Sequence, residues 1–149
     1  MESELKEMLA SLERTGYCQW MKGEGVPIAE GFSVENVCEL KLSPWRRLGG
    51  SGAFVHLYGM EGQTGMYVAE IPPGGALNPE RHLYEEIICI LAGHGATEIW
   101  QEGGQKRLFE WGPFSLFATG QRRPRAGATD GGNHRAGCDG FLSQPGIHL

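Results

Sequence analysis

One stretch of sequence decides the fold: Ile71-Pro-Pro-Gly-Gly-Ala-Leu-Asn-Pro-Glu-Arg-His-Leu-Tyr-Glu-Glu-Ile-Ile-Cys-Ile-Leu-Ala-Gly93. Asn78 and Pro79 have the residue types that begin a helix, with Gly93 at its end. The second half of the stretch is rich in β-branched residues, which pack better in a strand than in a helix. We therefore favour a strand here.

Three side chains in this stretch have the spacing of metal ligands. Residues two apart in a strand point to the same face, about 6.6 Å from each other. Glu80 and His82 can therefore reach one ion from one strand. His82 and Glu86 would lie about 13 Å apart on a straight strand, whereas metal–ligand bonds are about 2.0–2.2 Å long. We expect the chain to bend over residues 83–85, so that His82 and Glu86 reach the same ion.

Short apolar runs recur on both sides of this stretch, separated by Gly and Pro residues. They cover residues 53–58, 66–71, 87–91, 96–100, 108–111 and 115–118. Residues 102–105 read as a hairpin turn, residues 37–42 as extended chain, and Pro44 and residues 49–50 as turns. Short strands at this spacing without intervening helices indicate an antiparallel sandwich or barrel.

The N-terminus has a different pattern. Apolar residues recur with helical spacing at Leu5, Met8, Leu9 and Leu12. Ser3 can cap the start of such a helix, and Gly16 follows its end. The pattern predicts a short amphipathic helix over residues 1–16.

The stretch from Gly74 to Gly93 resembles the first motif of the cupin superfamily. That motif is Gly, five residues, His-x-His, three or four residues, Glu, six residues and Gly. Every spacing matches, and Glu80 stands where the family has its first His. The resemblance covers most of residues 66–118 and, more loosely, residues 16–65. It implies an all-β, cupin-like jelly-roll barrel.

The resemblance also implies a metal site. In the family, the two His and the Glu are joined by a third His from a second motif, and they hold one divalent metal ion (Fe, Mn, Ni, Cu or Zn). For this chain it implies His82 and Glu86 as metal ligands. Glu80 is either a further oxygen ligand, which would favour Mn²⁺ or Fe²⁺, or pairs with Arg81 or solvent. Tyr84 either contacts the substrate or fills the barrel.

The resemblance ends at residue 118. The family pattern continues with a Pro, an exposed His and an Asn, whereas here the next histidine, His134, comes about ten residues too late in a Gly-rich segment without strand character. Residues 1–118 carry nine Lys and Arg against sixteen acids, all Glu, while residues 119–149 carry four Arg and two Asp. We expect the third ligand and the closing strands to be missing. A frameshift in the coding DNA near codon 118 is our hypothesis for this change.

Composition limits the class of protein. The 149 residues suit one domain, and 40% hydrophobic with 21% charged residues exclude a membrane or wholly disordered protein. A net charge of −5 argues against a nucleic-acid binder. The N-terminus lacks the pattern of a secretory signal. The widely separated cysteines Cys18, Cys38, Cys89 and Cys138 predict free thiols and a cytoplasmic location.

We therefore expect a helix over residues 1–16, a cupin-like barrel over 17–118 and an atypical Gly/Arg-rich tail over 119–149, with the barrel incomplete or altered there. The leading functional hypothesis is a metal-dependent oxidoreductase with dioxygenase-like action on a small organic acid or aromatic. The alternative is a degenerate or truncated, non-catalytic cupin that serves in binding or oligomerisation. Strand edges left open would favour a homo-oligomer, such as a homodimer. We expect a small-molecule substrate and no nucleic-acid or membrane partner.

Overall fold

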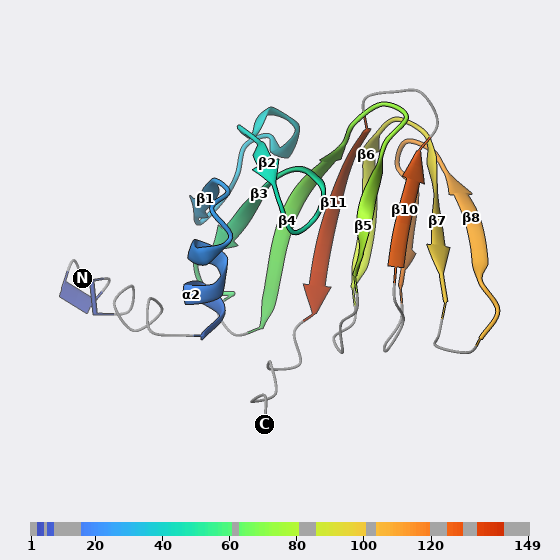
Figure 1. Cartoon of the computed structure of the whole chain (residues 1–149). Coiled ribbons are helices and arrows are strands. Elements are labelled where there is room, and N and C mark those ends of the chain that lie inside the picture. Colours follow the sequence, from blue (N-terminus) through green and yellow to red (C-terminus); the bar gives the residue numbers. More distant parts are fainter. Residues whose placement is uncertain are drawn as a thin grey trace.

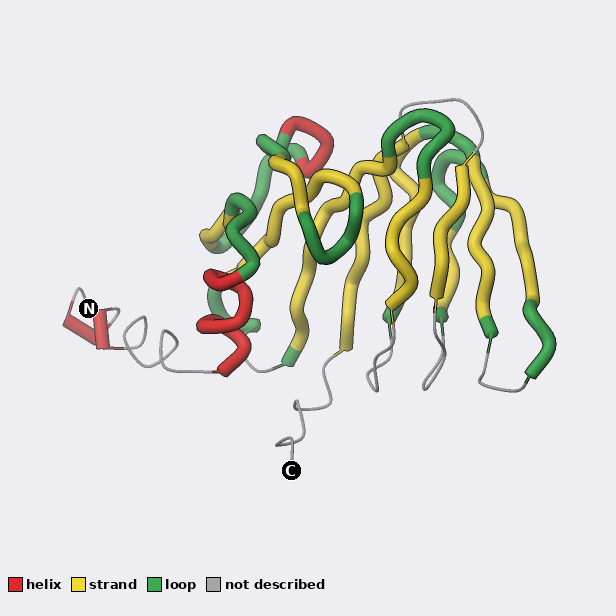
Figure 2. Tube along the Cα trace, viewed as in Figure 1, coloured by secondary structure: helices red, strands yellow, loops and turns green. Residues whose placement is uncertain are grey.

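The computed structural model describes the side chains of residues 3–4, 6–7, 16–60, 63–80, 86–100 and 104–119, and the backbone of residues 125–129 and 134–141. Most of these residues form strands (Figures 1 and 2). In chain order, the elements are α2 (Gly16–Gly23), β1 (Ile28–Gly31), the 3-10 helix η1 (Val37–Glu39), β2 (Ser43–Trp45), β3 (Gly50–Leu57), β4 (Thr64–Ile71), β5 (Ala76–Glu80), β6 (Ile87–Ala92), β7 (Gly95–Ile99), β8 (Arg107–Trp111), β9 (Leu116–Ala118), β10 (Arg125–Thr129) and β11 (His134–Phe141).

The strands form two sheets. One has seven strands in the order β1-β3-β4-β11-β6-β9, with β2 paired to β3, and the other has four in the order β5-β10-β7-β8. The pairing is antiparallel except between β1 and β3, which run parallel. The predicted all-β jelly-roll architecture is confirmed, and each of the six apolar runs forms a strand. No helix among the described residues is long and apolar enough to cross a membrane.

Two local predictions before β3 were wrong. Residues 37–39 form a 3-10 turn, because the Asn36 side chain accepts a hydrogen bond from the Cys38 backbone N–H at 3.0 Å. Pro44 lies in β2, at the margin of the sheet, where a missing N–H is tolerated. Of the helix predicted over residues 1–16, residues 3–4 and 6–7 are helical and most of the others lie outside the described part.

The prediction that strands are missing after residue 118 was also wrong. β10 lies between β5 and β7, and β11 lies between β4 and β6 (Figure 1). β11 pairs with β4 from His134 opposite Ile71 to Phe141 opposite Thr64. A sheet ladder uses backbone N–H and C=O groups that every residue except proline offers, so weak strand formers can pair where two neighbouring strands leave a place between them.

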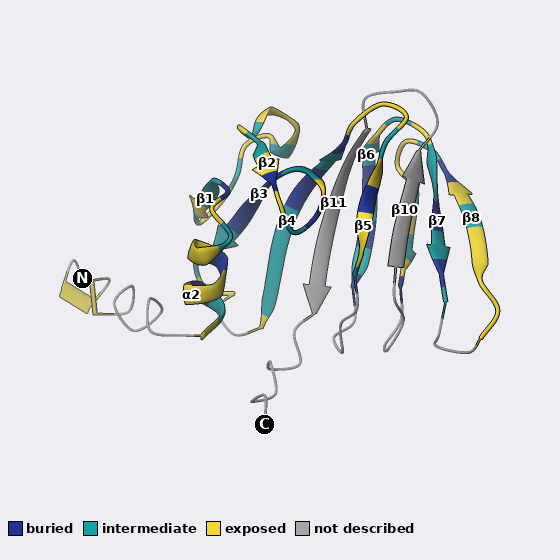
Figure 3. Cartoon of the chain, in the orientation of Figure 1, coloured by how far each residue is buried: buried dark blue, intermediate teal, exposed yellow. Residues whose placement is uncertain are grey.

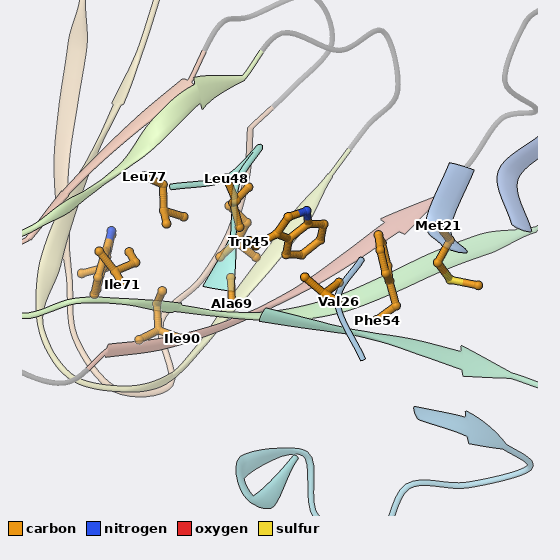
Figure 4. Close-up of a cluster of buried hydrophobic side chains, with 11 residues drawn as sticks. Met21, Val26, Trp45, Leu48, Phe54, Ala69, Ile71, Leu77 and Ile90 are labelled. Atoms are coloured by element: carbon orange, nitrogen blue, oxygen red, sulfur yellow. The ribbon is translucent and has the colours of Figure 1, made fainter. Parts of the chain in front are cut away.

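The hydrophobic core joins the two sheets. Phe54, Ile88 and Ile90 contribute to it from the seven-stranded sheet, and Leu77 and Trp111 from the four-stranded sheet. Phe54, Leu77 and Ile90 are labelled in Figure 4. Trp111 is the one buried residue of β8, which lies at the edge of the smaller sheet and is otherwise mostly exposed (Figure 3). Within the seven-stranded sheet, the buried residues lie mainly on β3, β4 and β6.

Tyr17 packs α2 against this core, because its hydroxyl group lies against the backbone of Gly65 in β4. The pKa of Tyr17 is raised from 10.0 to about 12, mainly by burial and to a smaller extent by the neighbouring Cys18, while Arg47 acts in the opposite direction. The folded protein therefore favours the neutral phenol. This contribution to stability is complete below pH 10 and is lost as the pH rises through about 12.

We predict that one phenol titrates near pH 12 in the folded protein, as measured by absorbance at 295 nm, and that Tyr17→Phe removes this late step. The denaturation midpoint of the wild type should also fall more steeply between pH 10 and 12 than that of the variant. Equal pH dependence of the two proteins would contradict the assignment to Tyr17.

Candidate metal centre

Two of the three predicted metal ligands are in the described part of the chain. Glu80 is the last residue of β5, in the four-stranded sheet, and Glu86 directly precedes β6, in the seven-stranded sheet. His82 and Tyr84 lie outside the described residues, and so does the predicted bend over residues 83–85. The two carboxylates thus come from different sheets.

Glu86 lies in the interior, with 1% of its surface exposed. It has the same parity along the strand as Ile88 and Ile90, which are both 1% exposed, so all three point toward the core. The carboxylate accepts a hydrogen bond from the Tyr67 hydroxyl at 2.8 Å on Oε1 and one from the Thr119 hydroxyl at 3.4 Å on Oε2. The Thr119 backbone N–H also donates to the Glu86 carbonyl oxygen at 3.1 Å.

Aromatic rings surround the Tyr67 partner of Glu86. The Tyr67 ring packs edge-on against Trp45, with centroids 5.2 Å apart, and against Phe54, with centroids 6.4 Å apart. Trp45 and Phe54 are fully buried (Figure 4). The hydrogen bond from Tyr67 is therefore made in surroundings of low polarity, where it is stronger than in water.

This donor set fits a metal ligand at Glu86. A carboxylate oxygen is a common ligand of divalent ions, and ligating carboxylates are usually oriented by hydrogen bonds from neighbouring groups. The hydroxyl groups of Tyr67 and Thr119 can orient Glu86 in this way. Among the described residues, no three His, Cys, Asp or Glu side chains lie close enough together to hold a metal ion. His82 is not among those residues, so its place in the site stays a prediction.

Glu80 has a partner that we did not predict from sequence. Its Oε1 accepts a hydrogen bond from Nη1 of Arg47, which lies in the turn between β2 and β3, 33 residues away in the sequence. The same guanidinium donates through Nε to Glu24 Oε2 at 2.7 Å. Glu24 Oε2 also accepts the Trp45 indole N–H at 2.5 Å.

Sequence reasoning missed the residues that surround the two carboxylates. Tyr67 and Thr119 lie 19 and 33 residues from Glu86, and Arg47 is equally remote from Glu80. No local pattern reports such contacts. The parity of Glu86 with Ile88 and Ile90 is the one signal that could have placed its side chain in the interior.

No family model matches the sequence, and the comparison with curated proteins gave no match. Solved structures are similar in fold. The polyketide cyclase RemF from Streptomyces resistomycificus is 19% identical, with a TM-score of 0.57, and the match covers 78% of this chain and 86% of the cyclase. A cupin-2 domain from Rhodospirillum rubrum is 16% identical, with a TM-score of 0.55, over 72% and 68% of the two chains.

Oxalate oxidase, solved in complex with the substrate analogue glycolate, is 17% identical with a TM-score of 0.52. The match covers 56% of this chain and 44% of the oxidase, so the chain spans less than half the length of that enzyme. Together these likenesses show that the chain has the cupin fold that its sequence predicts.

Proposed function

We propose that this chain, which has the cupin fold, is a metal-dependent enzyme whose single divalent ion is held by His82 and Glu86. The leading reaction is a dioxygenase-like oxidation of a small organic acid or aromatic compound. The observation that carries the proposal is Glu86, an acidic side chain 1% exposed in the interior with two hydroxyl partners. Burying a carboxylate costs free energy unless it is well paired, and a bound metal ion would offset that cost.

The described residues around Glu86 have different roles in this proposal. Tyr67 and Thr119 orient the Glu86 carboxylate, one on each oxygen. Trp45 and Phe54 pack around Tyr67 and keep water from this side of Glu86. A divalent ion bound there would supply Lewis acidity toward an oxygen atom of the substrate. Tyr84, two residues after His82, is proposed to contact that substrate.

Solved structures of this fold support an enzyme without selecting the reaction. The similar structures include both a polyketide cyclase and an oxalate oxidase. Since one fold serves different chemistries, the reaction depends on the residues at the site rather than on the fold. The oxidation remains the leading reaction because a His and carboxylate ligand set suits Fe²⁺ and Mn²⁺.

A non-catalytic role in binding or oligomerisation is the second candidate. The observation that favours it is the ion pair of Glu80 with Arg47, because a carboxylate engaged in this way is not available to a metal ion as it stands. The two candidates differ in whether the folded chain retains a metal ion through His82.

We predict that the purified wild type contains close to one equivalent of a transition metal, measured by mass spectrometry of the metals, and that His82→Ala loses most of it. His94→Ala is the matched control, because His94 is exposed and should leave the metal content unchanged. Oxygen consumption with a panel of small carboxylic acids and aromatics then tests the reaction. Metal far below one equivalent, and unaffected by His82→Ala, would exclude the enzyme and favour the non-catalytic candidate.

A further inference from the structure

The turn that carries Arg47 is fastened to β5, the strand that carries Glu80. The Asn78 backbone N–H donates to the Leu48 carbonyl oxygen at 2.7 Å, and the Asn78 side-chain amide donates to the Arg47 carbonyl oxygen at 2.9 Å. Glu80, two residues further along β5, accepts a hydrogen bond from the guanidinium of the same turn. Both partners of the ion pair are thus held on elements that are hydrogen-bonded to each other.

The Arg47 guanidinium is held between two aromatic rings as well. Its central carbon lies 4.9 Å from the centroid of the Trp45 ring and 5.2 Å from that of Trp20. Such contacts between a cation and a ring face are attractive and limit the positions that the side chain adopts. Arg47 therefore meets Glu80 in a defined geometry.

The ion pair is shielded from solvent. The exposed fractions of the side chains are 33% for Arg47, 15% for Glu24 and 11% for Glu80. Shielded pairs interact more strongly than surface pairs, and removing the cation leaves the carboxylates without compensation. One guanidinium thus neutralises part of the charge of two nearly buried carboxylates.

We propose that Arg47 holds Glu80 out of the metal site: the guanidinium, and not a metal ion, is the cation that Glu80 binds. A divalent ion next to Arg47 would be repelled by it and would have to displace it from Glu80. A metal ion in this chain is accordingly bound through His82 and Glu86 without Glu80. This last statement rests on the proposed function, whereas the pairing of Arg47 with Glu80 does not.

The pairing is tested without any metal by a double-mutant cycle of Arg47→Gln and Glu80→Gln, with unfolding followed in urea. We expect a coupling of about tenfold or more in the unfolding equilibrium constant. Lys106 and Glu98 form the matched control pair. Lys106 Nζ lies 3.4 Å from Glu98 Oε2, but the two side chains are 63% and 35% exposed. Their coupling should be no more than about twofold. Equal coupling in the two cycles would overturn the proposal.

The role toward the metal is tested by the affinity for Mn²⁺, from the electron paramagnetic resonance signal of the free ion. Glu80→Gln should change the Kd by no more than about twofold. Arg47→Gln should tighten binding about tenfold, because it leaves Glu24 and Glu80 without their cation. The gain should disappear in the double variant and be absent in Arg47→Lys, which keeps the charge.

The outcomes separate this inference from the proposed function. A tenfold weaker affinity in Glu80→Gln would show that Glu80 is a metal ligand and overturn the inference while supporting a metal site. No gain in Arg47→Gln would also overturn it. If the wild type binds no Mn²⁺ but Arg47→Gln gains Glu80-dependent binding, the proposed function fails and the inference stands.

Discussion

Trp45→Ala should lower the free energy of unfolding by about 3–5 kcal/mol, the range found when a buried aromatic side chain is truncated to alanine. Trp45 is 1% exposed and packs edge-on against Phe54 at 4.8 Å and against Tyr67 at 5.2 Å between ring centroids. Its loss leaves a cavity at the centre of the core. It also removes the indole N–H that donates to Glu24 and the ring beneath Arg47.

Trp20→Ala is the matched control for this prediction. Trp20 also contacts Arg47 and Phe54, but 41% of its surface is exposed, so its truncation should cost about 1–2 kcal/mol. Urea denaturation followed by the remaining tryptophan fluorescence measures both values. A cost below about 1 kcal/mol for Trp45→Ala would show that this cluster does not hold the fold together.

The contrast between Trp45 and its neighbours shows what the sequence predicts well. Strands β3, β4 and β6 to β9 were predicted because apolar residues recur in short runs between glycines and prolines, a local signal. Trp45 lies outside these runs, next to Pro44 and Arg46, in a segment without periodicity. Its burial depends on contacts with Phe54 and Tyr67, which come from other strands, β3 and β4.

The candidate site also has a part that the sequence predicts and a part that it does not. The motif spacing predicts Glu80 and Glu86 as candidate acidic ligands. Arg47 reaches Glu80 from the other sheet, whereas Tyr67 and Thr119 reach Glu86 from β4 and from the end of β9, in the same sheet as β6. All three partners belong to segments remote in the chain. The spacing therefore predicts which side chains to consider and leaves their partners open.

The C-terminal strands formed where the local sequence did not predict a strand. Residues 134–141 contain two glycines and no β-branched residue, and so offer little local preference for a strand. Their backbone nevertheless pairs with both β4 and β6. Side-chain propensity therefore underestimates the tendency of such a segment to form a strand, because two neighbouring strands supply hydrogen-bonding partners for its backbone.

Glu86→Gln should weaken the affinity for Mn²⁺ at least about a hundredfold. The loss of a group that only orients a metal ligand costs about 10- to 100-fold in metal affinity, and replacing the ligand's charge by a neutral amide should cost more. The amide oxygen can still accept the hydrogen bond that Tyr67 now makes at 2.8 Å. The metal-free variant should therefore keep its stability within about 1 kcal/mol.

Two further variants test whether the loss of affinity is specific to Glu86. Tyr67→Phe removes the hydroxyl that orients Glu86 but not the charge, so its affinity for Mn²⁺ should fall about 10- to 100-fold. Glu80→Gln should leave it nearly unchanged, because Arg47 already binds that carboxylate. This order, with Glu86 the most sensitive and Glu80 the least, is expected if the buried carboxylate is the ligand. An unchanged affinity for Mn²⁺ in Glu86→Gln would mean that Glu86 is buried for the fold and not for a metal.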